Sequence, residues 1–424
     1  METKCNRWLV LIATIIVNIC IGATYAWSVF ALPLGKLFGW SGPTVALAFT
    51  ITFVAGPIIM IAGGMLQDRK GAKFNIVLGG ILWGLGLFLT GFISSPEMLY
   101  FTFAIIAGIG GGLVYSGNVA NTNKFFPDKR GLAVGLAAAG YGSGAMIVAP
   151  IASTLIIHYG VLNTFKILGI AFLVIILLCS LIIKAAPAGY KPEGWTPPTP
   201  GNAGSAGAAD KNWKQMLQDP LWYVIACMFA VAALAGLMIL AHASPIGQTM
   251  FKLQPQTAAF YVSLIALFNV GGRIVFGFVS DKIGRQNTLA LIYALSACML
   301  FFLSNTTSTL GFAVAGAGIG AGFGGAQAIF PAIIAEKYGT KNVGVNYGFT
   351  FAAFGVAAYF GPMIAANVAK ASNGIYTEAF FIAMVLNFIG ISLTFVYRLI
   401  EKRGKALAVE NAVQQTCDTP NPDN

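Results

Sequence analysis

The stretch GFVSDKIGRQN at residues 277–287 decides the fold, because a related stretch, GGMLQDRKGAK, occupies residues 63–73. In the later stretch Gly277, Asp281 and Gly284 each have the same residue type 213 positions earlier. Two copies of one loop, separated by about half the chain, indicate an internal duplication. Long apolar segments flank both copies, so the duplicated unit is predicted to be built from hydrophobic helices.

The composition indicates that these helices lie in a membrane. The chain has 424 residues, of which 57% are hydrophobic and only 9% are charged, and this lies outside the usual composition of soluble domains. A bilayer core about 30 Å thick needs roughly 20 apolar residues per helix. Twelve such segments lie near residues 8–34, 44–66, 73–93, 97–124, 130–157, 163–186, 219–247, 256–279, 286–304, 308–335, 342–368 and 376–399. We therefore predict an all-α integral membrane protein.

The duplication extends over six helices, because Pro150 in the fifth segment and Pro362 in the eleventh are 212 positions apart. Such a tandem repeat gives two parallel, pseudo-symmetric six-helix bundles around a central site. The segment between the halves is rich in Pro, Gly and Ala, which is typical of a flexible connector. The predicted parts are an N-terminal bundle at 1–186, a cytoplasmic linker at 187–218, a C-terminal bundle at 219–400 and a cytoplasmic tail at 401–424.

The net charge of +11 is explained by membrane orientation. With a cytoplasmic N-terminus, Lys36, Lys166, Lys252 and Lys370 lie near the outer face, Arg273 lies within a span, and the other 20 of the 25 Lys and Arg residues lie inside. This follows the positive-inside rule, so both termini are predicted to be cytoplasmic in a cell inner membrane, and no nucleic-acid partner is needed. The long first segment is interpreted as a helix and not as a cleaved signal peptide.

Several chemical functions are excluded. Four of the six cysteines fall within spans and two in the tails, with neither a disulfide framework nor zinc-ligand spacing. The glycine-rich runs at 108–117 and 316–327 lack the flanking features of phosphate loops, and they favour close helix crossing instead. No nucleophile triad is found, so we predict no enzyme activity, no ATP-driven pumping, no cofactor and no metal.

The repeated loop has the pattern Gly-x-x-x-Asp-[Arg/Lys]-x-Gly, and in a chain of two six-helix halves it resembles the major facilitator superfamily of secondary transporters over essentially the whole length. Two stretches, VYSGNVANTNKFFPDKRGLAVGLAAAGYGSG at 114–144 and FNVGGRIVFGFVSDKIGR at 268–285, are similar to its bacterial oxalate/formate-antiporter and monocarboxylate-porter branch. This resemblance implies that the chain transports small organic anions.

The residues of the repeated loop are interpreted as structural and gating elements. Glycine permits tight turns and close helix approach, and a carboxylate at a helix end can hold the N-terminus of a neighbouring helix. A direct proton-binding role for the two aspartates is the alternative. The residues concerned are Gly64, Asp68, Arg69, Gly71, Gly277, Asp281, Gly284 and Arg285.

Arg273 is the main candidate for binding the transported anion. It lies eight residues before Asp281, which places it about 12 Å into the membrane at 1.5 Å per residue. An arginine at such depth costs about 2.5–3.5 kcal/mol or more and usually serves function. All 14 acidic residues lie in loops, tails or at span edges, so we expect Arg273 to face an aqueous cavity without an acidic partner. A substrate carboxylate matches the guanidinium fork.

Charge counting narrows the substrate. One deep cation neutralises a monocarboxylate but leaves one charge of a dianion uncompensated. The resemblance implies a second cation in oxalate-exchanging relatives, a lysine in the eleventh span. Phe354 or a neighbour occupies that position here, with no Lys or Arg between Lys341 and Lys370. This difference favours acids like lactate or pyruvate.

Proton coupling leaves several routes open. Asn269 lies one helical turn before Arg273, where the resemblance to animal monocarboxylate porters implies an aspartate, and asparagine cannot titrate. His242, in the seventh span, titrates near neutrality, so it is either a proton-coupling group or a hydrogen-bonded residue lining the cavity. Alternatively, the anion and its proton cross together at Arg273.

The rest of the predicted cavity wall is drawn from helical spacing and the resemblance. Small-molecule sites are mostly apolar with a few placed polar groups. The wall candidates are Tyr25, Tyr115, Asn118, Tyr141, Tyr347, Phe351 and Phe354.

From the sequence we therefore predict a monomeric secondary transporter that carries small monocarboxylates, with a proton, by alternating access around Arg273. Two alternatives are an oxalate/formate-type anion exchanger and an organic-acid sensor that does not transport. Multidrug efflux is disfavoured, because it commonly uses a deep carboxylate.

Overall fold

The computed structural model describes the backbone of residues 6–126, 128, 130–186, 190, 192, 210–339 and 342–418. Within these ranges the chain is helical, without strands, and twelve helices are long and apolar enough to cross a membrane. The predicted all-α fold with twelve spans is confirmed. The chain is a multi-pass membrane protein.

The helices follow the chain in regular order. In the first half they are α1 (Arg7–Gly22), η1 (Ala23–Ala26), α2 (Trp27–Phe38), α3 (Gly42–Val54), α4 (Gly56–Lys70), α5 (Ala72–Thr90), α6 (Pro96–Leu99), the π-helical η2 (Tyr100–Ala107), α7 (Gly108–Phe125), α8 (Arg130–Tyr159) and α9 (Val161–Ile182). In the second half they are α10 (Trp213–Leu217), α11 (Pro220–Thr249), α12 (Pro255–Ile283), α13 (Arg285–Asn305), α14 (Thr309–Tyr338), α15 (Val343–Ala371) and α16 (Thr377–Asp418).

Local sequence signals set many helix starts. Ser41, Ser308 and Asp219 cap α3, α14 and α11 through side-chain oxygens that accept backbone N–H groups, which satisfies donors that have no partner within the helix. Proline occupies the first turn of α11 and α12, where its missing N–H costs nothing. Gly71 and Gly284 adopt φ values of +84° and +86° before α5 and α13, so the predicted tight turn occurs in both copies of the loop.

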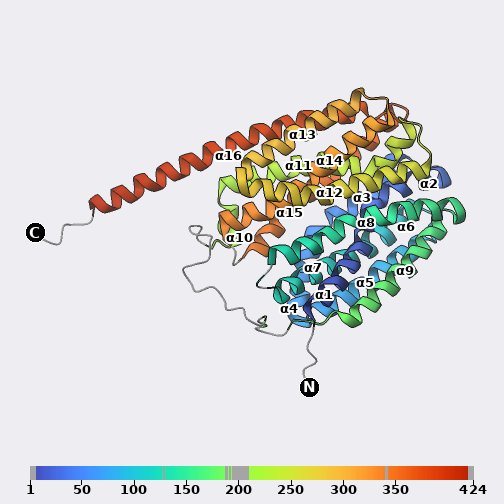
Figure 1. Cartoon of the computed structure of the whole chain (residues 1–424), viewed down its shortest axis with the longest axis horizontal. Coiled ribbons are helices and arrows are strands. Elements are labelled where there is room, and N and C mark those ends of the chain that lie inside the picture. Colours follow the sequence, from blue (N-terminus) through green and yellow to red (C-terminus); the bar gives the residue numbers. More distant parts are fainter. Residues whose placement is uncertain are drawn as a thin grey trace, which may run out of the picture.

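The two halves lie side by side in Figure 1, with the C-terminal half above the N-terminal half. The most extensive contacts between them are those of α8 with α12, α3 with α15 and α2 with α11, and α4 with α15, η1 with α11 and α2 with α12 add smaller ones. We call the end of the bundle that carries α10 and the start of α1 the linker end, and the opposite end the far end. Because α2 and α3 belong to the far end, the cross-half pairs α2–α11 and α3–α15 lie on that side.

The predicted linker at 187–218 falls largely outside the described residues. Its last part forms α10, and the carbonyl of Lys211 accepts hydrogen bonds from the side-chain amides of Asn342 and Asn346 at 3.3 and 3.0 Å. The predicted end of the last span near residue 399 is too early as a helix end, because α16 continues to Asp418. The residues beyond 400 include Ala, Leu, Glu, Lys and Gln, which are good helix formers.

Candidate functional site

Arg273 of α12 reaches the boundary between the two halves. Its Nη2 donates to Oε1 of Gln327 at 2.7 Å, its Nε to Oδ1 of Asn269 at 3.3 Å, and its Nη1 to the carbonyl of Ala138 at 3.3 Å. The first two partners belong to the C-terminal half and the third to α8 of the N-terminal half. None of these three partners carries a charge, and within the described part of the chain Arg273 makes no ion pair. Neutral groups therefore hold the guanidinium among the described residues.

A close crossing of α12 and α14 brings Gln327 to Arg273. A Cβ added at Gly324 would overlap the carbonyl of Asn269, and one added at Gly272 would overlap the carbonyl of Ala321. Only glycine lets the two backbones approach so closely. Gln327 follows Gly324 by about one turn, and Arg273 follows Asn269 by one turn, so the two side chains meet. The predicted role of the glycine-rich run at 316–327 in helix crossing is confirmed.

The N-terminal half supplies three tyrosines to this site. Tyr141 makes edge contacts with Tyr25 and with Tyr115, each with ring centroids 5.3 Å apart. The Tyr25 ring stacks on Phe53 at 5.7 Å, and its hydroxyl accepts a hydrogen bond from Nε2 of Gln327 at 3.5 Å. All three tyrosines interact electrostatically with the Arg273 guanidinium.

Aromatic rings of the C-terminal half continue the wall. Phe354, which is fully buried, stacks on Phe351 at 4.6 Å and lies 5.9 Å from Phe53 of the other half. Tyr347 packs on Phe351 at 5.8 Å and interacts electrostatically with Arg273. Phe323 lies between Tyr25 and Phe354, at 6.4 and 6.2 Å. The predicted aromatic residues therefore form one cluster across both halves.

A small cavity of about 10 Å³ lies next to Tyr25 between the halves. Val262 and Ala266 contribute to it from the same face of α12 that carries Asn269 and Arg273, because these positions follow one another at intervals of three or four residues. Ala145 of α8 and Ala243 of α11 line other sides. The cavity has room for about one water-sized group, and we call it the small interface cavity.

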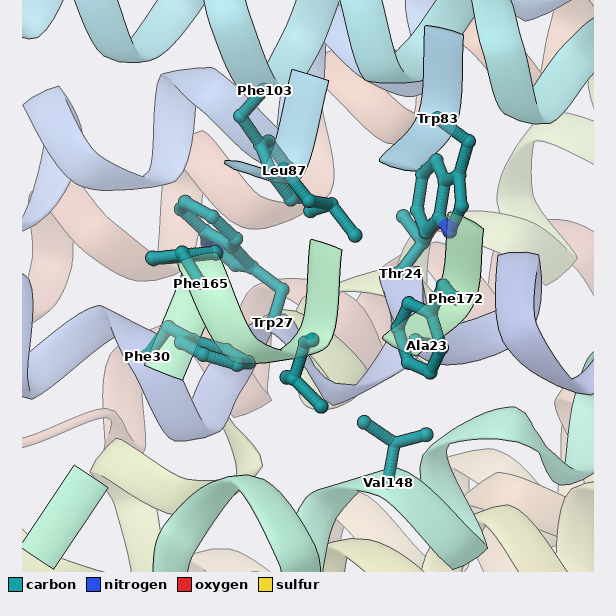
Figure 2. Close-up of a pocket in the computed structure, with 11 residues that line it drawn as sticks. Ala23, Thr24, Trp27, Phe30, Trp83, Leu87, Phe103, Val148, Phe165 and Phe172 are labelled. Atoms are coloured by element: carbon teal, nitrogen blue, oxygen red, sulfur yellow. The ribbon is translucent and has the colours of Figure 1, made fainter. Parts of the chain in front are cut away.

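A second cavity, of about 20 Å³, lies inside the N-terminal bundle and away from Arg273. Figure 2 shows Trp27, Trp83 and Phe165 among its lining side chains, which are almost all apolar. The indole N–H groups of both tryptophans are buried without a described hydrogen-bond partner. An apolar space of this size has no charged group to fix an organic anion, so we do not assign the site to it.

Asn118 lies behind the cluster and not at Arg273. Its Nδ2 donates to Oδ1 of Asn18 at 2.8 Å, and Nδ2 of Asn18 donates to the carbonyl of Ala137 at 2.8 Å. Asn118 is completely buried between α7 and α1. The expectation that it lines the cavity directly is not met, because helical spacing gives a shared face but not which neighbour covers it.

His242 is also placed differently from the expectation of a cavity-lining histidine. It is buried, its Nδ1 lies 3.3 Å from the carbonyl of Met238, and its ring lies 5.5 Å from that of Tyr376. Leu240 and Ala243 of the same helix line the small interface cavity, so His242 points to the other side of α11, toward the start of α16.

The repeated loop is described mainly in its second copy. The carboxylate of Asp281 pairs with Nη1 of Arg285 at 2.6 Å, and Nη2 of Arg285 pairs with Glu336 at 2.7 Å. This network joins α12, α13 and α14 within the C-terminal half. A Cβ at Gly277 would meet open space, so the expected close approach is absent there. The predictions for Gly64, Asp68 and Arg69 fall on side chains outside the described set.

The sequence reasoning missed Gln327, Phe53, Phe323 and the carbonyl of Ala138. Gln327 left a signal, since it is the polar residue that ends the run GAGIGAGFGGAQ. Phe53 and Phe323 left none, because single aromatic residues in apolar helices are common. A backbone carbonyl has no sequence signal.

Comparisons with known proteins agree with this architecture. The family model described as Major Facilitator Superfamily matches residues 12–362. The oxalate:formate antiporter of Oxalobacter formigenes is 32% identical over 96% of both chains, and the MFS-type transporter YhjX of Escherichia coli is 31% identical over 83% of this chain and 86% of its own. Monocarboxylate transporter 12 of Xenopus laevis is 25% identical over 96% and 92%.

Among solved structures, a bacterial homologue of the human lysosomal transporter Spinster, in an inward-facing and unoccupied conformation, matches with a TM-score of 0.74 at 16% identity, covering 94% of this chain and 98% of that one. This match supports the same fold.

Proposed function

Because the chain belongs to the major facilitator superfamily and is a membrane transporter, we propose that it carries small monocarboxylates, such as lactate or pyruvate, by alternating access around Arg273. Superfamily members are in general not enzymes. The relatives named as an oxalate:formate antiporter and as a monocarboxylate transporter support small organic anions as the substrate class.

The main support for this proposal is the positive charge of Arg273, which lies at the boundary between the halves. Among the described residues, the hydrogen-bond partners of the Arg273 guanidinium, which lies between the halves, are all neutral. A monocarboxylate would replace a neutral acceptor with an anionic one, which adds Coulomb attraction and allows two parallel hydrogen bonds to the guanidinium fork. The hydroxyl of Tyr25 lies near the same guanidinium, because Gln327 bonds both groups, so Tyr25 is placed to donate to the carboxylate or to a hydroxyl beside it.

The apolar surroundings favour a single charge and a short chain. Phe354 packs against rings of both halves, and Phe354 or a neighbour stands where the family resemblance implies a lysine in oxalate exchangers. A second carboxylate would meet rings and not a cation there, which is costly. The small interface cavity, further along the Arg273 face of α12, has room for about one methyl-sized group.

For energy coupling, we propose symport of the anion with a proton, both moving together at Arg273. Symport through His242 is less well supported, because that ring packs on Tyr376 on the far side of α11. One observation favours the second candidate, anion exchange: the described contacts of Arg273 include no titratable carboxylate or histidine. We also propose that the protein is a monomer in the inner membrane. The distribution of Lys and Arg supports a cytoplasmic position for both termini.

Uptake of radiolabelled L-lactate into proteoliposomes tests these proposals. Uptake stimulated by an inward proton gradient, blocked by unlabelled pyruvate and not by oxalate, is the result expected for proton-linked monocarboxylate transport. Uptake that ignores the gradient and requires an internal anion establishes exchange. Protein that binds labelled lactate but moves none across the bilayer in either assay is a sensor, and the transport proposal is then wrong.

Arg273→Lys and Arg273→Ala should each reduce uptake by about 100-fold or more, since they remove a planar charged fork whose loss costs several kcal/mol. Both proteins should still elute as a single species from a sizing column. Lys214→Ala is the matched control, because Lys214 is a cation of α10 at the linker end. Normal uptake by Arg273→Ala would refute the binding model.

A further inference from the structure

We propose that the side-chain amide of Gln327 acts as an internal substitute for the substrate carboxylate. In the empty transporter this amide is bonded to Arg273, and the incoming anion must displace it. This inference rests on the proposed function and assigns a role to a residue outside the predicted wall. Gln327 Oε1 accepts from Nη2 of Arg273 at 2.7 Å, which is the shortest hydrogen bond that the guanidinium makes in the described structure.

The chemistry of the carboxamide suits this role. Its oxygen accepts a hydrogen bond as a carboxylate oxygen does, but it carries no charge. A buried guanidinium with unsatisfied N–H groups costs free energy, so the amide lowers the energy of the empty site. A carboxylate carries a negative charge and can accept two parallel hydrogen bonds from the guanidinium, so it can take the place of Gln327 when substrate enters.

Gln327 also links the halves. Its Nε2 donates to the hydroxyl of Tyr25, at 3.5 Å, while its Oε1 accepts from Arg273. Tyr25 follows Gly22, whose backbone packs directly against that of Tyr141 on α8. The Gln327 side chain thus connects Arg273 of the C-terminal half to Tyr25 of the N-terminal half. In the absence of substrate this bridge gives the Arg273 guanidinium and the Tyr25 hydroxyl a hydrogen-bond partner.

Two consequences distinguish this role from simple packing. Removing the amide removes a competitor, so the anion binds more tightly. It also leaves N–H groups of Arg273 without a hydrogen-bond partner when the halves close around the empty site. The empty transporter therefore reorients across the membrane more slowly. Exchange, in which the site is always loaded while it crosses, is spared.

The experiment compares exchange with net uptake in proteoliposomes for Gln327→Met, which keeps the length and apolar volume but has no amide. We expect the KM for lactate exchange to fall by about threefold or more and the ratio of net uptake to exchange to fall by about tenfold. Gln327→Asn, whose amide is one methylene shorter, should move both values in the same direction. Gln327→Glu, which places a fixed carboxylate on Arg273, should abolish both modes.

Gln248→Met is the matched control, since Gln248 bonds Ser244 near the far end of α11 and its loss should leave both values unchanged. Folded Gln327→Met and Gln327→Asn proteins with wild-type KM and wild-type ratio would overturn the role of Gln327 while the transport function stands. A wild-type protein that exchanges no carboxylate would instead refute the proposed function itself.

Discussion

At the scale of single residues, an unexpected charge was the strongest sequence signal for the site. Arg273 was identifiable from the sequence because an arginine in the middle of an apolar run is costly and needs a reason. Its neutral partners were not, because Gln327 lies 54 positions away and the third partner is a backbone carbonyl. Packing decides which side of a helix faces a given neighbour, and a sequence alone does not show it. For the same reason the sequence did not give the surroundings of Asn118 and His242.

Phe354 offers a test of the charge argument. Phe354→Lys would place a second cation in the aromatic cluster, beside Phe53 and Phe323. A dianion would then be neutralised, so we expect the inhibition constant of oxalate against lactate uptake to fall by about tenfold or more, equivalent to about 1.4 kcal/mol. The measurement is a competition series in proteoliposomes.

Phe354→Met is the comparison for this variant, because it removes the ring without adding charge. It should leave oxalate a poor competitor. If Phe354→Met gains oxalate inhibition as strongly as Phe354→Lys, space and not charge excludes the dianion.

At the scale of helices, the glycine-rich run of α14 determines where the polar groups meet. The sequence predicted that these glycines serve a close crossing, and the structure confirms it at Gly320 and Gly324, where an added Cβ would overlap backbone carbonyls of α12. The sequence did not give the partner helix, because small residues show only that something approaches. The crossing with α12 sets the height of Gln327 against Arg273.

Gly324→Ala should therefore destabilise the protein and lower its activity. The added methyl would overlap the carbonyl of Asn269, and overpacking of this kind costs about 1–3 kcal/mol. We expect a lower melting temperature in detergent together with weaker lactate binding. Gly271→Ala on α12 is the control, since a Cβ there meets open space. Equal melting temperatures for both variants would show that the crossing tolerates the methyl.

At the scale of the whole molecule, the duplication was readable from two loops, and the twelve spans from hydropathy. The tandem repeat also implied their arrangement in two parallel six-helix bundles. The structure adds which helices make the most extensive contacts between the halves, namely α8 with α12, α3 with α15 and α2 with α11. These pairings depend on contacts between residues hundreds of positions apart, which a single sequence does not encode in any local pattern.

Alternating access requires the pair α3 and α15 to separate at the far end. Near the far end, a Cβ at Gly42 of α3 would lie 3.9 Å from the carbonyl oxygen of Ala366 on α15. In a background without the six native cysteines, Gly42→Cys with Ala366→Cys should lose transport when a short methanethiosulfonate cross-linker joins the two thiols and regain it on reduction. Each single cysteine variant should keep its transport after the same treatment. Full transport by the cross-linked protein would show that α3 and α15 stay together during the cycle.

The neutral surroundings of Arg273 have a consequence for the membrane voltage. An empty site carries one positive charge, a site loaded with a monocarboxylate alone carries none, and a site that also holds the symported proton carries one again. A potential of 100 mV acts on a full elementary charge with about 2.3 kcal/mol, scaled by the fraction of the field that the site crosses. In proton symport, voltage therefore acts on the loaded and the empty site in opposite directions and leaves the whole cycle electroneutral. In anion exchange only the uncharged, loaded site crosses, so voltage leaves the rate unchanged.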